Sequence, residues 1–226
     1  MFAIIKKEFK NYFLSPIGYV FIGLFLLLAS LFFYTDVILY KSINFEYMFF
    51  SLSTILTFII PILTMRMFAE EKKSGTDQLL FTSPLSIKKI VLGKFLSTVL
   101  ILLIAELLTL IYFVILMFLG SPHFATALVT LFGFLLLGMA YISFGMFASS
   151  ITENQIIAGV ITIGFFVFTW FLPNLNSMFE PFSLMNSFTK FPSGIISLNE
   201  IFLFLSFICL FIILTIFVFQ RRKNLK

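Results

Sequence analysis

The sequence predicts an all-α integral membrane protein that crosses a lipid bilayer six times. Of its 226 residues, 61% are hydrophobic and only 11% are charged, whereas soluble domains carry roughly 25% charged residues. The mean hydropathy is +1.13, and the apolar residues fall in long runs instead of the single stripe of a soluble amphipathic helix. Because there are too few charges to cover a water-facing surface, lipid is the expected solvent.

Six apolar segments are long enough to cross a hydrocarbon core of about 30 Å as helices. They cover about 17–35, 48–65, 95–119, 125–149, 156–173 and 200–220. Polar and turn-forming residues separate them at 36–46, Gly120-Ser121-Pro122, Thr152-Glu153-Asn154-Gln155 and Pro173-Asn174. Within the second segment, Pro61 is expected to bend the helix.

Basic residues are distributed unevenly across these spans. With both termini on one side, that side holds 13 of the 15 lysines and arginines, and the other side holds only Lys41 and Lys190. Because basic residues are retained on the cytoplasmic side, this asymmetry predicts cytoplasmic termini in the cell membrane. No small-residue cleavage pattern follows the first apolar stretch, so that stretch is expected to remain as the first span.

Residues 2–13 are expected to form an amphipathic helix that lies in the cytoplasmic interface. Apolar and basic side chains fall on different sides of it at helical spacing. The apolar side holds Ile5, Phe9, Tyr12 and Phe13, and the polar side holds Lys6, Lys7, Lys10 and Asn11. Ser15-Pro16 then turns the chain into the first span.

The longest polar stretch lies on the predicted cytoplasmic side, between Arg66 and Lys94. Its pattern is a helix, a break at Ser74-Gly75-Thr76-Asp77, a short helix over 78–81 and a second break at Ser83-Pro84. Ser86 can cap the helix that continues into the third span. This is more order than a simple tether needs.

The segment from Asn174 to Asn199 is predicted to lie on the outer side. It is rich in Phe, Pro and Ser, and Glu180 and Lys190 are its charged residues before Asn199. Because irregular backbone at membrane depth must be covered by protein, this segment is expected to re-enter the membrane or to pack on the spans.

The composition excludes several kinds of chemistry. The chain holds one Cys (Cys209) and one His (His123), so it can build neither an internal disulfide nor a Cys/His metal cluster. Gly93-Lys94 is followed by Phe95, and no Gly stands five residues before Gly93, so this is not a phosphate-binding loop. If the protein uses ATP, another chain must bind it. No catalytic residues, metal or cofactor are expected on this chain, and no nucleic-acid partner.

Glu106 is the one ionisable residue well inside a predicted span. A charge there costs about 2.5–3.5 kcal/mol on insertion scales, so the side chain should face protein or water. It could line a polar or cation pathway. The interpretation we favour is a neutral carboxylic acid bonded to a neighbouring helix, with Thr109 one turn further on as a helper.

The fourth span carries small residues at Gly138, Gly145 and Ser149, spaced so that they share one helix face. Such a face lets another helix approach closely. The helix that packs there could belong to the same chain or to a second copy.

Together, these segments resemble the ABC-2 type permease family, and more closely its branch of gliding-motility-associated and copper-enzyme-maturation permeases. The matching stretches run almost from end to end. They are Glu8-Phe9-Lys10, Tyr12-Phe13, Ser15–Tyr19, Pro61–Arg66, Phe68–Lys72, Ser74-Gly75-Thr76, Leu79-Leu80, Ser83-Pro84, Gly93-Lys94-Phe95, Gly145 and Ser149–Gln155.

The resemblance implies a single permease domain over 1–226, of the type V ABC exporter kind, without a nucleotide-binding domain. Two such permeases would pair, as a homodimer or heterodimer, and each would engage a separate ATPase subunit that binds ATP and Mg²⁺. The ATPase would dock on a coupling helix and on a second cytoplasmic contact. The implied coupling residues are Glu70, Glu71, Lys72, Lys73, Gly75, Thr76, Asp77, Leu79 and Leu80, and those of the second contact are Glu153, Asn154 and Gln155.

Two questions stay open at this stage. The first is what the protein transports and in which direction. Export is the commoner direction in the family, and a cavity with walls of Phe, Ile and Leu suits many substrates. The rival function is an ion-coupled secondary transporter or channel-like protein built around Glu106. A membrane-embedded enzyme would need more convergent polar groups than the spans contain.

Overall fold

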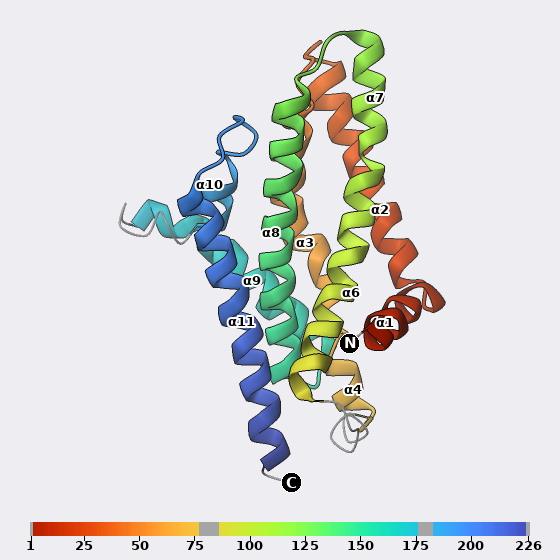
Figure 1. Cartoon of the computed structure of the whole chain (residues 1–226), viewed down its shortest axis with the longest axis vertical. Coiled ribbons are helices and arrows are strands. Elements are labelled where there is room, and N and C mark those ends of the chain that lie inside the picture. The colour runs from red at the N-terminus through yellow and green to blue at the C-terminus, as the bar shows by residue number, and fades with distance from the viewer. Residues whose placement is uncertain (1, 77–85, 176–182, 225–226) are drawn as a thin grey trace.

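The computed structural model describes residues 2–76, 86–175 and 183–224, and within these ranges the chain is helical with no strand (Figure 1). Six stretches are long and apolar enough to cross a membrane: Ile17–Ile38, Glu46–Lys73, Ile87–Leu119, Phe124–Ile151, Gln155–Pro173 and Leu198–Arg222. The six predicted spans are confirmed, with edges shifted by several residues. The third begins at Ile87, earlier than its apolar run, because its first turns carry polar side chains on a helix that continues without a break.

Several spans consist of two consecutive helical elements. The first is α2 (Ile17–Phe32) followed by η1 (Phe33–Ile38), a π-helical turn, and the second is α3 (Glu46–Thr64) followed after a short turn by α4 (Ala69–Lys73). The third is α6 (Ile87–Leu108) followed by α7 (Leu110–Leu119). The remaining spans are α8 (Phe124–Ile151), α9 (Gln155–Leu175) and α11 (Leu198–Asn224).

Helix α8 is the central element of the bundle. It packs against α3, α6, α9 and α11, and its buried residues lie along its whole length (Figure 1). Aromatic rings fill the contacts around it: Phe134 lies against Phe25 and Phe49, and Tyr141 stacks on Phe166 at 4.0 Å between ring centroids. The outer faces of α9 and α11 are mostly exposed apolar side chains, as expected for surfaces that contact lipid.

The small residues of α8 serve packing inside this chain. A Cβ added at Gly138 would lie 2.2 Å from Cδ2 of Leu102 on α6, and one at Gly145 would lie 2.3 Å from Oγ1 of Thr64 on α3. Both neighbouring helices therefore approach α8 more closely than any side chain at these positions would permit.

The helices differ from the prediction at two places. Pro173 lies inside α9, which continues to Leu175, because Pro173 removes only one helical hydrogen bond near the end of the helix. The third span is interrupted at Thr109, where α6 ends and α7 begins. The predicted short helix over 78–81 lies outside the described residues.

The segment after α9 packs on the spans. It contains the short helix α10 (Leu184–Phe188), and Leu184, Phe188 and Phe191 are buried. An ion pair between Lys190 and Glu200 ties it to the start of α11. The expectation of packing holds for residues 183–197, and residues 176–182 lie outside the described ranges.

Helix α1 (Phe2–Leu14) is the predicted N-terminal amphipathic helix, and it contributes no membrane span. It packs on α6, and Figure 1 shows it beside α4 at the end of the bundle where the C-terminus also lies. Both termini, the amphipathic helix α1 and the short helix α4 therefore lie toward one end of the molecule.

Candidate functional site

Helix α4 is only five residues long, so it depends on neighbouring elements for its position. Its N-terminal backbone is capped by a side chain from another span: Oγ of Ser149 on α8 accepts hydrogen bonds from the N–H groups of Phe68 and Ala69, each at 3.0 Å. The same hydroxyl donates to the carbonyl of Met65 at 3.0 Å. One buried hydroxyl thus satisfies three backbone groups at a helix start that carries no cap of its own.

Lys72 holds the other side of α4 against α8. Its ammonium donates to the carbonyl of Ser150 and lies 5.8 Å from the ring centroid of Phe219 on α11. The side chain is buried. The sequence placed Lys72 among the charges offered to a soluble partner, and the structure corrects this, because the short helix turns this residue toward the end of α8.

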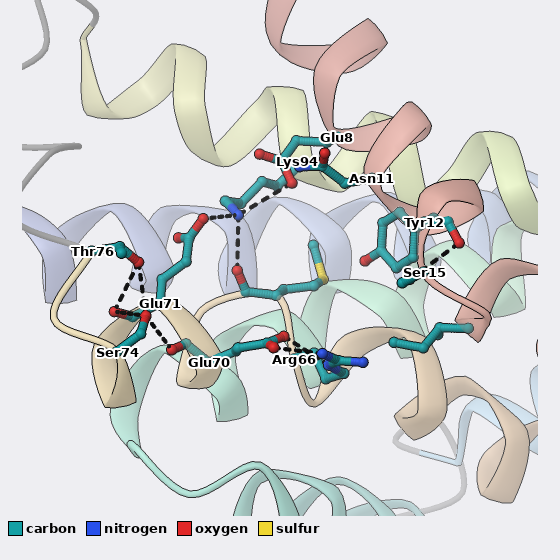
Figure 2. Close-up of a pocket in the computed structure, with 12 residues that line it drawn as sticks. Glu8, Asn11, Tyr12, Ser15, Arg66, Glu70, Glu71, Ser74, Thr76 and Lys94 are labelled. Atoms are coloured by element: carbon teal, nitrogen blue, oxygen red, sulfur yellow. Dashed lines mark hydrogen bonds and ion pairs between the residues drawn. The ribbon is translucent and has the colours of Figure 1, made fainter.

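Lys94 is the centre of a buried charge cluster at the same end of the protein. Its Nζ lies 2.7 Å from Oε1 of Glu71 on α4 and 3.4 Å from Oε2 of Glu8 on α1. It also donates to the carbonyl of Met67 at 2.9 Å and lies 5.2 Å from the ring centroid of Phe68. This Lys94 cluster (Lys94, Glu8, Glu71 and the Met67 carbonyl) joins α6, α4 and α1 (Figure 2).

The energetics of this cluster differ from those of a surface ion pair. The Lys94 side chain is only 5% exposed, so removing its partners would leave a buried charge, which costs about 3–5 kcal/mol. Oε2 of Glu71 has no hydrogen-bond partner among the described residues, so the cluster retains an open acceptor. By contrast, the bidentate pair of Arg66 and Glu70, at 2.5 and 2.7 Å, is partly exposed and should contribute only about 0–1 kcal/mol.

Tyr12 anchors α1 on the bundle. Its hydroxyl donates to the carbonyl of Leu63 at 3.1 Å and lies at hydrogen-bond distance, 3.1 Å, from Oγ1 of Thr98. Burial raises the pKa of the Tyr12 hydroxyl, so it stays a neutral donor. At Gly93, an added Cβ would lie 2.7 Å from Cγ2 of Ile4, so α1 lies directly on the backbone of α6.

A cavity of about 250 Å³ opens between α1 and α4 beside the Lys94 cluster. Its polar lining comes from Glu8, Asn11, Tyr12, Arg66, Glu70, Glu71, Ser74, Thr76 and Lys94 (Figure 2). Within the part of the chain that the structure describes, no group of three or more His, Cys, Asp or Glu residues could hold a metal ion. The arrangement holds α1, α4 and α6 together.

A polar surface lies next to this cluster, and we call it the coupling face after the role that the family resemblance implies for its residues. It is formed by the exposed Lys73, Ser74, Gly75 and Thr76 and by the α8–α9 turn with Glu153 and Asn154. Helix α4 contacts both α8 and α9, so the two parts are neighbours. Gly75 adopts a φ of +70°, a left-handed conformation that favours glycine, and this ends the α4 turn.

The α8–α9 turn is itself well fixed. The backbone N–H of Ile156 donates to Oδ1 of Asn154 at 2.9 Å, which caps α9, and Gln155 is the first residue of that helix. Glu153 pairs with Arg222 of α11 at 3.3 Å. The remaining predicted coupling residues, Asp77, Leu79 and Leu80, lie outside the described residues.

Glu106 lies apart from this site, buried within α6. Its Oε1 has no hydrogen-bond partner among the described residues. The expectation that Thr109 assists the carboxyl group is wrong: Oγ1 of Thr109 donates to the backbone carbonyl of Glu106 at 2.6 Å. The same carbonyl also accepts the backbone N–H of Thr109 at 3.0 Å, so both groups of Thr109 bond to the main chain where α6 ends.

Sequence reasoning missed the residues that hold the site together. The sequence analysis gave none of them a role in a charge cluster: Lys94 and Glu8 belong to stretches that match the family pattern, and Tyr12 belongs to such a stretch and to the apolar side of the N-terminal helix. A usable signal was present: Lys94 is a lysine inside a helix that continues into an apolar span, and such a residue requires a partner.

Six apolar spans define a multi-pass helical membrane protein, in which α1 and the exposed polar residues that follow α4 lie toward one end (Figure 1). A family model described as ABC-2 family transporter protein matches residues 2–224. The chain therefore belongs to the ABC-2 family and is a membrane component of a transporter, not itself an enzyme. A search of curated proteins finds no match to the chain.

Proposed function

We propose that this chain is the permease subunit of an ABC transporter that exports a substrate across the cytoplasmic membrane, driven by ATP hydrolysis on a separate ATPase chain. The whole chain acts as one permease domain, and two permeases pair around the pathway. ATP and Mg²⁺ bind to the ATPase, and this chain holds no cofactor. Both termini face the cytoplasm, as the distribution of 13 of 15 basic residues favours.

The observation that supports this best is that α4 is fastened on two sides. The Lys94–Glu71 pair fastens it to α6 at 2.7 Å, and Ser149 fastens it to α8. Both anchoring residues are buried. A partner that binds the coupling face therefore contacts a rigid element, not a loose loop.

The same contacts provide a path for motion. If ATP-driven closure moves the docked ATPase, the force on Lys73–Thr76 passes through Glu71 and Lys94 to α6, and through Ser149 to α8. Because Glu8 joins the same ammonium at 3.4 Å, α1 moves with them. Packed helices connected this way rock as rigid bodies, which is how spans can alternate between inward-open and outward-open states.

One observation favours a second candidate function. Glu106 is a buried carboxyl whose Oε1 lacks a hydrogen-bond partner within the described ranges. In an ion-coupled secondary transporter, such a group would bind the coupling ion or proton. This reading requires no ATPase.

The test is co-purification. The tagged chain is extracted from its native membrane in mild detergent, and its partners are identified and quantified by mass spectrometry. The proposal expects an ABC ATPase at comparable molar amount and a second permease copy or a related permease. Absence of any ATPase, with an intact permease, would contradict the proposal and favour the ion-coupled alternative.

A further inference from the structure

A second cavity, of about 830 Å³, lies at the other end of the bundle from the Lys94 cluster. It is formed by η1, the start of α3 and residues 189–193 after α10. Its size falls within the range of cavities that hold drug-sized ligands, about 300–1,000 Å³. The coupling mechanism makes no use of this cavity.

Among the described residues that line it, Asp36 is the one that carries a charge. The carboxylate is oriented by two hydroxyl groups: Thr35 donates to Oδ1 at 2.8 Å and Ser51 donates to Oδ2 at 2.5 Å. Each oxygen keeps acceptor capacity, since an ionised carboxylate offers about four lone-pair sites. No ion pair to Asp36 forms within the described residues.

Two lysines that adjoin lining residues in the sequence form no ion pair with this carboxylate. Lys190 follows the lining residue Thr189, but its ammonium pairs with Glu200 of α11. Lys41 is exposed and does not line the cavity. The described lining therefore presents one acidic side chain and no basic one, which disfavours anionic ligands.

Three aromatic rings line the cavity together with Asp36. Tyr40, Tyr47 and Phe50 all line the cavity and all are exposed. Aromatic faces attract organic cations, and they also cover the apolar body of a ligand. Asp36 lies on η1, which is a π-helical turn. Such turns are found frequently at functional sites.

We infer that this cavity binds an amphiphilic ammonium compound, whose cationic head lies against Asp36 and whose apolar body lies against Tyr40, Tyr47 and Phe50. A free amine in solution and the ammonium headgroup of a lipid share this chemistry. The inference does not depend on the proposed function, since binding here requires neither an ATPase nor transport.

The test uses equilibrium dialysis of radiolabelled benzyltrimethylammonium against the purified protein in phosphatidylglycerol nanodiscs. The anion phenylmethanesulfonate, of similar size, is the ligand control. Saturable binding of the cation but not of the anion is expected. Asp36→Asn keeps the shape of the side chain and removes its charge, and it should weaken cation binding about tenfold or more, as expected for a lost charge-assisted contact.

A matched pair of tyrosines tests the aromatic contribution. Tyr47, 52% exposed, lines the cavity, whereas Tyr34, 55% exposed, lies on η1 outside it. Tyr47→Leu should weaken binding about two- to fivefold, the size of an exposed cation–π contact. Tyr34→Leu should leave it unchanged. Unchanged cation affinity in Asp36→Asn that elutes as a single folded species, or equal binding of the sulfonate, would overturn the inference.

The two ligand sources are separated by repeating the measurement with half of the phosphatidylglycerol replaced by phosphatidylethanolamine. The ratio of wild-type to Asp36→Asn affinity corrects for the change in surface charge. If the ratio falls when phosphatidylethanolamine is added, the lipid headgroup competes with the labelled cation for the site. If the ratio stays constant, the site binds free amines. A ratio near one in both lipids would contradict both versions.

Discussion

The ammonium of Lys94 lies 2.7 Å from a carboxylate oxygen of Glu71, and this contact joins the third span to the short helix α4. Glu8 of α1 reaches the same ammonium at 3.4 Å. One buried lysine thus connects the interfacial helix, the coupling face and a membrane span. The first prediction concerns what happens when this charge is removed.

Lys94→Met keeps the apolar stem of the side chain but leaves Glu8 and Glu71 without their cation. We expect a loss of about 3 kcal/mol in the free energy of unfolding in detergent, because the remaining acids are partly buried and unpaired. Hydrogen exchange in residues 2–14 should accelerate as α1 detaches. Lys73→Met, on the exposed side of α4, is the matched control and should change stability by less than about 0.5 kcal/mol. Equal effects of the two variants would contradict a special role for Lys94.

Ser149→Ala should loosen α4. The change removes one hydroxyl that serves the N–H groups of Phe68 and Ala69 and the carbonyl of Met65. We expect a loss of about 2–3 kcal/mol, since buried backbone groups are left unsatisfied, with faster amide exchange at 68–73. Ser143→Ala is the control: Ser143 is buried in the same helix, but its hydroxyl donates only to the carbonyl of Ala140, one turn earlier. If both variants exchange alike, the cap from α8 is not what holds α4.

Gly145→Ala should destabilise the contact between α8 and α3. The added Cβ would lie 2.3 Å from Oγ1 and 2.8 Å from Cβ of Thr64, and a β-branched side chain so close to its own backbone has little room to move. The expected loss is about 1–3 kcal/mol in thermal or chemical unfolding.

Substitutions at two other glycines serve as comparisons for Gly145→Ala. At Gly138 the clash is with the flexible end of Leu102, so Gly138→Ala should cost less than Gly145→Ala. At Gly164 an added Cβ would meet nothing within 4 Å, and Gly164→Ala should be neutral or stabilise α9 by up to about 1 kcal/mol. A reversed order would show that the helices do not approach at these positions.

If Glu106 is a neutral carboxylic acid, Glu106→Gln should leave the unfolding temperature nearly unchanged, because an amide has a similar size and polarity. Glu106→Leu should raise stability by about 1–3 kcal/mol, since it removes a buried polar group whose Oε1 is unpaired. Both are measured by unfolding in detergent. A loss of transport in Glu106→Gln, with unchanged unfolding, would instead support the pathway role.

The number and approximate position of the spans could be predicted because bilayer thickness fixes the length of an apolar helix. Turn residues such as Gly120-Ser121-Pro122 then marked the breaks, and helix α1 followed from its two-sided pattern. The face of α8 with Gly138 and Gly145 could also be predicted from the sequence, because helical spacing determines which residues share a side.

The contacts at the candidate site could not be predicted, because they depend on which way short elements turn. Lys72 and Lys73 are neighbours in sequence, yet Lys72 is buried and Lys73 is exposed. The cap from Ser149 joins residues about 80 positions apart. The break between α6 and α7 at Thr109 contains no Pro or Gly, so the sequence carries no signal for it. The hydroxyl of Thr109 donates to the backbone there.

The most direct test of the account is site-directed cross-linking at the coupling face. In a Cys209→Ser background, which removes the exposed native thiol, Thr76→Cys is compared with Ser42→Cys at the other end of the bundle. A photoreactive group is attached to each cysteine in membranes that contain the co-purifying ATPase. The account predicts a cross-link to the ATPase from position 76, stronger with ATP cycling, and none from position 42. A cross-link from position 42 alone, or from neither position while the ATPase remains bound, would contradict the assignment of the coupling face.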